Sequence, residues 1–282
     1  MLLGFNLLLW TTHVTQEHFH LFEEIRKTGY DGVELPIFEG DPEHFRKVGQ
    51  VAKDAGLRIT AVTVLPDEQT SAISPDPASR ANALKRLHWA LDCLSAAGGE
   101  LLCGPFYQPL GVFTGEPATT EERAGIVEVH SQAADYAAKL NLKLAVEPLN
   151  RFECHALNTV EDTAAVVTKV ARPNYGMLYD TFHQNIEEKD PVGVILPNIA
   201  QINHVHVSEN DRGTPGKGHV PWDATFKAFK KGGYQGFYTI EAFGRALPAL
   251  AAATRVWRDF FPSRDEVYRF GHDFLREAHA KA

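Results

Sequence analysis

The chain reads Leu142-Lys-Leu-Ala-Val-Glu147 near its centre, a short apolar run that ends in a carboxylate. Strands that are buried on both faces of a parallel sheet have this apolar pattern. A helical pattern precedes the run at Thr120–Leu140, and another follows it at Thr159–Val170. The second helix opens with Thr159-Val-Glu-Asp162, which is similar to a capping box. The region therefore predicts a buried strand between two helices, the building unit of parallel α/β folds.

The alternation of a short strand and a longer helix continues toward both ends of the chain. We expect strands at Leu2–Leu9, Gly32–Leu35, Arg58–Leu65, Glu100–Cys103, Leu142–Glu147, Tyr175–Asp180, Ile202–Val207 and Gly236–Glu241. Glycines close several of the intervening segments, as is common at helix ends. We expect the helices at Glu17–Thr28, Pro42–Ala55, Pro77–Ala97, Thr120–Leu140, Thr159–Val170, Pro191–Asn198, Trp222–Lys231 and Ala246–Phe260, with an extra C-terminal helix at Arg264–Ala280.

Eight strand–helix alternations predict an α/β fold of the (β/α)8 type, the TIM barrel, with right-handed crossovers. The 282 residues of the chain suit this fold, which typically needs about 250. No linker interrupts the alternation, so we expect one domain over residues 1–282. An open doubly wound sheet is the alternative, but no Gly-x-Gly-x-x-Gly motif follows the first expected strand.

The composition limits the partners and the compartment of the protein. Cys93, Cys103 and Cys154 form no Cys-x-x-Cys pair, which is typical of a reducing compartment, and we expect a cytoplasmic protein. The formal net charge of −8, without a cluster of Lys or Arg, argues against a nucleic-acid partner. The apolar run Leu2–Trp10 is too short to span a membrane and lacks the basic flank of a signal peptide.

Polar side chains stand at or near the ends of the expected strands five to eight. They are Glu147, Asp180, His206 and Glu241, and each lies about one strand–helix unit, roughly 30 residues or more, from the next. Because function in a parallel barrel gathers at the C-terminal ends of the strands, we expect these side chains to converge. One such residue alone would be interpreted as a helix cap, but four in register predict a metal site. This oxygen-rich set suits Mn²⁺, Co²⁺ or Mg²⁺ better than structural zinc, and we expect Mn²⁺.

Other polar residues lie near the same rim. Glu34 ends the second expected strand, and His204 shares a strand face with His206, so we interpret His204 as a partner that supports a ligand. Trp10 and His13 are candidates for the pocket wall, although Trp10 fits the core equally well. The loops after strands five to seven add Arg151, Glu153, His183 and Arg212, with pairing to Glu209 or Asp211 as the alternative role of Arg212; His18, His20 and His44 are expected on the surface.

Along nearly its whole length the chain resembles the ketose 3-epimerases of the D-tagatose and D-psicose type, within the xylose-isomerase-like barrels. The resemblance is sharpest in Glu147-Pro-Leu-Asn-Arg-Phe-Glu153, Asp180-Thr-Phe-His-Gln-Asn-Ile-Glu-Glu188, His204-Val-His-Val-Ser-Glu-Asn-Asp-Arg-Gly213 and Ile240-Glu-Ala-Phe243. The chain departs from the family at Phe5-Asn-Leu7, where the family often has an aromatic residue facing the substrate, and at Thr63-Val-Leu-Pro66.

The resemblance implies a role for each candidate residue. The metal would be held by Glu147, Asp180, His206 and Glu241, and the two glutamates would also act as the acid/base pair. The sugar hydroxyls would be contacted by Glu153, His183 and Arg212. The resemblance also implies a homodimer or homotetramer, for which the aromatic residues near the C-terminus are candidate contacts, namely Trp257, Phe260, Phe261, Tyr268 and Phe270.

Two glutamates on opposite sides of a bound 2-ketose favour one reaction over its relatives. One glutamate would remove the C3 proton to give a cis-enediolate, and the other would return a proton to the opposite face. This predicts metal-dependent C3 epimerisation of free ketoses of the tagatose, psicose, fructose and ribulose class. An aldose–ketose isomerase, which needs one base, a phosphorylated-sugar epimerase and a keto-inositol dehydratase are the alternatives on the same barrel. Glu209 and Asp211 disfavour a phosphate, whereas Lys217 favours one.

A metal-dependent barrel nuclease is disfavoured, because it would need more histidine ligands and a positively charged face. A non-catalytic sugar-binding barrel is disfavoured too, since binding alone gives no reason for two opposed glutamates.

Overall fold

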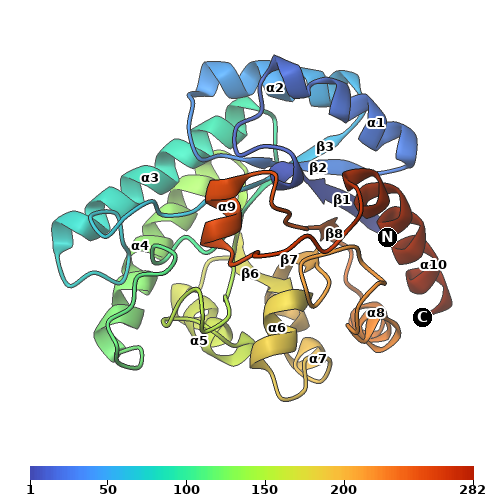
Figure 1. Cartoon of the computed structure of the whole chain (residues 1–282). Coiled ribbons are helices and arrows are strands. Elements are labelled where there is room, and N and C mark those ends of the chain that lie inside the picture. Colours follow the sequence, from blue (N-terminus) through green and yellow to red (C-terminus); the bar gives the residue numbers. More distant parts are fainter.

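The computed structural model describes residues 1–282, and its eight strands form a closed barrel (Figure 1). Each strand pairs in parallel with the next one in sequence, and β8 pairs in parallel with β1. The predicted α/β barrel is confirmed, and the doubly wound alternative is wrong because the sheet has no open edge. The strands are β1 (Leu2–Asn6), β2 (Gly32–Pro36), β3 (Arg58–Val62), β4 (Leu101–Gly104), β5 (Lys143–Val146), β6 (Tyr175–Asp180), β7 (Ile202–Val207) and β8 (Phe237–Ile240).

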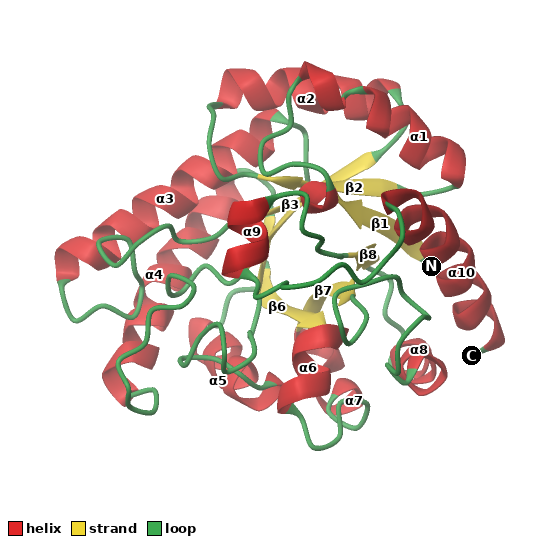
Figure 2. Cartoon of the chain, in the orientation of Figure 1, coloured by secondary structure: helices red, strands yellow, loops and turns green.

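Helices surround the strands on the outside of the barrel (Figure 2). The α-helices are α1 (His20–Thr28), α2 (Pro42–Asp54), α3 (Pro77–Ala96), α4 (Thr120–Lys139), α5 (Val160–Val170), α6 (Thr181–Glu187), α7 (Ile195–Asn198), α8 (Trp222–Lys231), α9 (Pro248–Ala253) and α10 (Gly271–Lys281). Short 3₁₀ turns lie at η1 (Leu7–Leu9), η2 (Gln16–His18) and η3 (Ile199–Gln201), and a π-helical turn, η4 (Glu266–Phe270), precedes α10. No helix is both long and apolar enough to cross a membrane.

Several expected boundaries at the N-terminal end are wrong for local reasons. The first strand ends at Asn6 instead of Leu9, because the Asn6 side chain accepts a hydrogen bond from the Leu8 N–H (2.9 Å) and starts the turn η1. The third strand likewise ends at Val62, short of Leu65. The first helix is divided into η2 and α1.

The C-terminal third also differs from the prediction. Helix α9 covers only Pro248–Ala253 of the expected Ala246–Phe260, and Arg255 just after it adopts a left-handed φ of 59°. Of the expected Pro191–Asn198 helix only α7 forms, and the C-terminal helix begins with the π-helical turn η4. Helix α6 was not predicted, because it follows β6 without an intervening loop.

Side-chain caps fix where the helices on the barrel surface begin. Asp41 caps α2 and Asp76 caps α3 through their carboxylates. Thr159 caps α5, but Asp162 bonds the Thr159 hydroxyl and not its backbone, so the predicted capping box is only half formed. A complete box forms at α4, where Glu122 accepts from the Thr119 N–H (2.7 Å) and Thr119 accepts from the Glu122 N–H (3.1 Å).

One glycine allows two outer helices to approach closely. Gly49 lies on the buried face of α2, and a Cβ built there would stand 2.1 Å from the carbonyl oxygen of Ala97, which follows α3. No side chain fits that space. The α2–α3 contact therefore depends on a residue without a Cβ at this position.

Exposure separates the aromatic residues near the C-terminus into two groups. Trp257 (67% exposed) and Phe270 (39% exposed) face solvent, whereas Tyr268 is buried and packs near Phe5 and Trp10. Tyr268 is thus part of the core and not available as a subunit contact. Helix α10 lies beside the N-terminus (Figure 1), where Arg276 donates to the carbonyl oxygen of Met1 (3.0 Å).

Candidate metal centre

The barrel brings the four predicted ligand residues together at the C-terminal ends of consecutive strands. Glu147 directly follows β5, Asp180 ends β6, His206 lies in β7 and Glu241 directly follows β8. All four are buried, and one nitrogen or carboxylate oxygen of each lies within 4.8 Å of the others. We call this group the upper cluster. The spacing by one strand–helix unit therefore predicted the convergence correctly.

The upper cluster contains polar atoms that no protein group satisfies. The Nδ1 of His206 and the Oε1 of Glu147 are buried without a hydrogen-bond partner. The same Nδ1 lies 3.5 Å from Glu241 Oε1, 3.7 Å from Asp180 Oδ2 and 3.9 Å from Glu147 Oε1. Since buried polar atoms are normally partnered, atoms converging in this way fit a bound cation.

Electrostatics also favour a positive partner in the upper cluster. Burial raises the pKa of the Glu147 carboxyl well above its usual value, and Glu241 and Asp180 add to this effect against the opposing influence of His206. Burial would lower the pKa of His206, but the carboxylates of Glu34 and Glu241 outweigh burial and raise it. The buried, negatively charged environment of the upper cluster therefore suits a cation.

Arg212 reaches the upper cluster from the loop after β7. Its Nη1 donates to Glu241 Oε2 (2.7 Å) and Asp180 Oδ2 (3.0 Å), and its guanidinium lies over the Phe182 ring. Burial would raise the pKa of Asp180, but Arg212 and the neighbouring histidines hold it below its usual value. A left-handed backbone (φ 65°) at Arg212 accompanies this inward position.

The alternative pairing of Arg212 with its loop neighbours is wrong. Glu209 is buried and accepts from the Gly216 N–H (2.8 Å) and the Trp222 indole N–H (3.1 Å). Asp211 accepts from the Gly213 N–H (2.9 Å). Both carboxylates therefore hold the loop in shape, while Arg212 serves the upper cluster.

His183 and Glu153 line the site beside the upper cluster. The Nδ1 of His183 lies 2.9 Å from the Asn150 backbone N–H, and its Nε2 lies 2.8 Å from Nη2 of Arg212 and 3.6 Å from Glu147 Oε1. Burial and Arg212 lower the pKa of His183, so its imidazole is neutral. Burial raises the pKa of Glu153, whose Oε1 accepts from the Asn150 side chain (2.8 Å).

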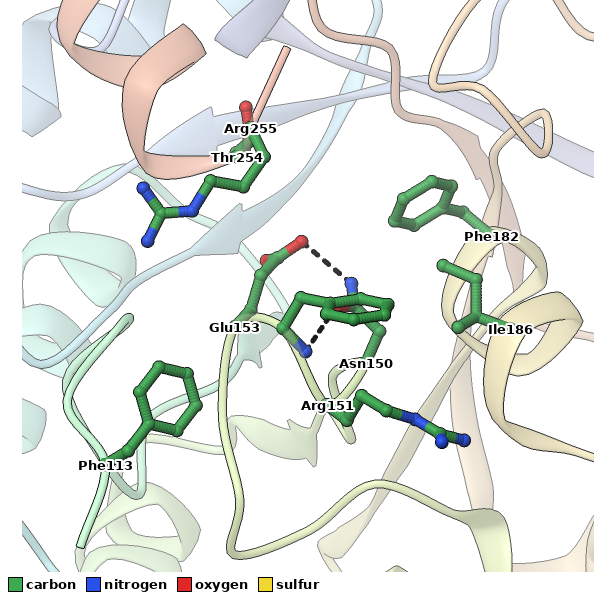
Figure 3. Close-up of a pocket in the computed structure, with 9 residues that line it drawn as sticks. Phe113, Asn150, Arg151, Glu153, Phe182, Ile186, Thr254 and Arg255 are labelled. Carbon is green, nitrogen blue, oxygen red and sulfur yellow. Dashed lines mark hydrogen bonds between the residues drawn. The ribbon is translucent and has the colours of Figure 1, made fainter. Parts of the chain in front are cut away.

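Two neighbouring spaces adjoin this site and share Glu153 and Thr254 in their walls. The inner cavity, of about 50 Å³, is lined by apolar side chains and by six polar or charged residues, Glu147, Glu153, His183, Arg212, Glu241 and Thr254. Glu153 and Thr254 also line an outer pocket of about 710 Å³. Figure 3 shows Glu153 at the centre of that pocket, between Arg255 on one side and Phe182 on the other. Helix α9 covers the inner cavity, because Leu250 forms part of its wall.

Some of the other candidates lie elsewhere. Trp10 is half-buried and packs against the core, with its ring centroid 5.1 Å from that of Phe5. His13 stacks on His44 at 4.4 Å, so His44 is partly buried in this contact and is not a simple surface residue. Arg151 lines the outer pocket (Figure 3), where it pairs with Glu187 (3.0 Å) and its side chain is 61% exposed. None of these residues lines the inner cavity.

A second buried group lies next to the upper cluster, and most of its members were not predicted from the sequence. Glu34 and His204 were noted as neighbours, but Asn6, Thr60 and Cys103 were not singled out, although all of them contact Glu34. Burial would raise the pKa of Glu34, yet His206 and His204 hold it well below its usual value. The alternation of inward-facing residues along the strands was the one available signal.

The barrel and its site place the chain among the enzymes that perform chemistry at the C-terminal ends of barrel strands. The chain belongs to the xylose isomerase-like TIM barrel family, whose model matches residues 22–278.

Known relatives and solved structures narrow the class. The chain is 33% identical over 276 residues to the "Probable ketose 3-epimerase" of Synechocystis sp., covering 98% of this chain and 96% of that protein. It is 33% identical over 284 residues to the ketose 3-epimerase of Arthrobacter globiformis, with the same coverage. The crystal structure of D-allulose 3-epimerase from Methylomonas sp. with D-allulose superimposes with a TM-score of 0.92 at 30% identity, over 99% of this chain and 97% of that one. The protein is therefore an isomerase-class enzyme acting on carbohydrates.

Proposed function

We propose that the protein is a divalent-metal-dependent ketose 3-epimerase acting on free 2-ketoses. The observation that carries the proposal is the convergence of two carboxylates, Glu147 from the end of β5 and Glu241 from the end of β8, on one buried cluster. The names of the relatives support the same reaction. Inversion at a carbon needs one group to remove a proton and another to deliver one, and two glutamates meet this need.

The metal would be held by Glu147, Asp180, His206 and Glu241, with Mn²⁺ as our first choice and Co²⁺ or Mg²⁺ as alternatives. Such an ion would polarise the substrate carbonyl and lower the energy of the negative charge that develops beside it. The unpartnered Nδ1 of His206 and Oε1 of Glu147 are the atoms that support this assignment.

The protein's own groups would perform the proton transfers. One glutamate removes the C3 proton. The electron pair of the broken C3–H bond becomes the C2–C3 double bond, and the π electrons of the carbonyl move to its oxygen, which gives a cis-enediolate. The other glutamate then delivers a proton to C3 from the opposite face, which restores the C2 carbonyl and inverts C3. Each glutamate serves as base in one direction and as acid in the other.

Glu153, His183 and Arg212 would orient the sugar. His183 would offer a ring nitrogen, Glu153 a carboxylate acceptor, and Arg212 N–H donors to the hydroxyl groups of the sugar. A preference for unphosphorylated ketoses follows from the lining of the inner cavity, since Arg212 is its only cation and is already paired with two carboxylates. The formation of a homo-oligomer and the cytoplasmic location stay predictions.

The test is a product analysis in deuterated water. Purified protein is treated with a chelator, reloaded with Mn²⁺, and supplied with fructose, tagatose, psicose, sorbose or ribulose and with their phosphates. We expect a 2-ketose product that carries deuterium at C3 and none at C1, with activity lost on chelation and restored by Mn²⁺. Formation of an aldose, label at C1, full activity of a verified metal-free sample, or a strong preference for phosphates would contradict the proposal.

A further inference from the structure

Four buried residues form a second group directly behind the upper cluster, on the inner side of the barrel. They are Glu34 of β2, Cys103 of β4, and His204 and His206 of β7, and we call them the lower cluster. His206 belongs to both groups. Its Nδ1 faces the upper cluster, while its Nε2 lies 2.7 Å from Glu34 Oε1.

The lower cluster is a closed hydrogen-bond network. Glu34 Oε1 accepts from the side chain of Asn6 (2.9 Å) and from His206, and Oε2 accepts from His204 (2.7 Å), Thr60 (2.9 Å) and Cys103 (3.3 Å). Both carboxylate oxygens of Glu34 and the Nε2 nitrogens of His204 and His206 therefore have hydrogen-bond partners. Separations of 2.7 Å are those of charge-assisted hydrogen bonds and are shorter than the spacing of two ligands around one ion. Hydrogen bonds, and not a second metal ion, thus account for the short distances within the lower cluster.

The bond to Glu34 decides which nitrogen of His206 can bind a cation. An imidazole that binds a metal ion is in its neutral form, which has one N–H donor and one acceptor nitrogen. Because a carboxylate can only accept, the hydrogen must lie on Nε2, and the lone pair of Nδ1 then points into the upper cluster. A partner that fixes the tautomer and the ring orientation of a metal-binding histidine is common at metal sites.

Asn6 connects the same carboxylate to a second residue of the upper cluster. Its side-chain nitrogen donates to Glu34 Oε1 and also to Glu241 Oε1 (3.0 Å), so both of its hydrogens are used. Its side-chain oxygen accepts from the Leu8 N–H, which fixes the direction of the amide. Glu34 therefore holds His206 directly and Glu241 through Asn6.

We propose that Glu34 is a positioning residue that sets the Nδ1 lone pair of His206 and, through Asn6, the orientation of Glu241. The inference rests on the proposed function only in assuming that the upper cluster binds a metal. Glu34 does not touch the substrate space, since it is absent from the lining of both the inner cavity and the outer pocket.

The test compares two replacements of Glu34 that both remove the charge and both fill the space. Glu34→Gln keeps one acceptor oxygen, which can face His206 and Asn6 while its NH₂ faces Thr60 and His204. Glu34→Leu has no acceptor at all. The Mn²⁺ dissociation constant is measured by calorimetry on the chelator-treated full chain. Thr60→Val is the matched control, because Thr60 bonds only the other oxygen, Oε2.

We expect Glu34→Leu to weaken Mn²⁺ binding by about 10–100-fold, the usual effect of losing a partner of a metal ligand, and Glu34→Gln to recover about tenfold of this loss. Thr60→Val should bind Mn²⁺ as the wild type does. Equal affinities of the leucine variant and the wild type, or equal losses in both Glu34 variants, would overturn the proposal. A wild-type chain that binds no Mn²⁺ would instead contradict the proposed metal centre itself.

A measurement on the wild type covers the case in which Glu34→Leu does not fold. The Mg²⁺-loaded protein is diamagnetic, so ¹H–¹⁵N correlation spectra report the protonation of each imidazole nitrogen. We expect His206 to carry its hydrogen on Nε2. A hydrogen on Nδ1 in the loaded protein would overturn the proposal.

Discussion

Glu147 and Glu241 face the upper cluster with different partners. Glu241 is held at both oxygens, by Asn6 and by Arg212, whereas Oε1 of Glu147 has no partner. The two side chains are thus not interchangeable, even though both would act in proton transfer. Hydrogen bonds within the protein fix the orientation of Glu241, whereas the Glu147 side chain is free to move toward a bound ion or substrate.

Replacing either glutamate by glutamine should abolish proton transfer on one face of the substrate and leave it on the other face. We expect Glu147→Gln and Glu241→Gln each to lower kcat by about 10²–10⁴-fold, the usual contribution of a general acid or base. Each variant keeps one base, so each should still exchange deuterium into C3 of one ketose epimer but not the other. Glu128→Gln, an exposed glutamate on α4, is the control. Near-wild-type turnover in either variant would disprove the two-base assignment.

For single residues, the sequence predicted where a side chain lies better than which groups it contacts. Glu147, Asp180, His206 and Glu241 could be placed because each follows or ends an apolar strand, and strand ends meet at one rim of a barrel. The partners of Arg212 could not be predicted, since a left-handed φ at an arginine leaves no mark in the sequence. The contacts of Asn6 across the barrel depend on the register between strands, which a single sequence does not reveal.

Among the elements, the strands were easier to predict than the short helices. Buried parallel strands are apolar runs between glycine-terminated helices, and all eight were recognised. Helix α6 was not predicted because Asp180 both ends β6 and caps the helix, where it accepts from the Phe182 N–H (2.6 Å). Helix α9 was predicted too long because its alanine-rich sequence has high helix propensity, whereas the left-handed Arg255 breaks the helix.

The contact between α2 and α3 supplies a test at the element scale. Gly49→Ala should destabilise the protein by about 1–3 kcal/mol, because the added methyl group meets the carbonyl oxygen of Ala97 and the helices must move apart. The free energy of unfolding in urea measures the effect. Gln50→Ala, on the exposed face of the same helix, should change it by no more than about 0.5 kcal/mol. An unchanged stability of Gly49→Ala would show that the two helices pack less tightly than described.

Across the whole molecule, buried histidines connect stability to pH. His130 is fully buried on α4 between the Tyr175 hydroxyl (2.6 Å) and the Phe106 carbonyl oxygen (3.0 Å). Burial lowers its pKa to about 4. The folded state therefore favours the neutral imidazole, and the resulting stability is complete above the unfolded-state pKa of about 6.5 and is lost as the pH falls toward 4.

Acidification should accordingly weaken the fold through this residue. Between pH 7 and pH 4 we expect His130 to account for a loss of about 3 kcal/mol in the free energy of unfolding. In His130→Gln that part of the pH dependence should vanish, whatever the effect of the substitution at pH 7. His20→Gln, at an exposed position, should leave the pH dependence unchanged. Parallel pH profiles for His130→Gln and the wild type would contradict the assignment.

The lower cluster also affects how the chain folds. Glu34 lies in β2, but its imidazole partners arrive with β7, 170 and 172 residues further along the chain. A half-barrel of the first four strands would contain the carboxylate with Asn6, Thr60 and Cys103 but without either histidine. A buried carboxylate without a positively charged partner costs several kcal/mol. Such a half-barrel is therefore expected to stay open and hydrated around Glu34. Closure of the barrel and assembly of the upper cluster then become a single cooperative, late step governed by contacts between distant parts of the chain.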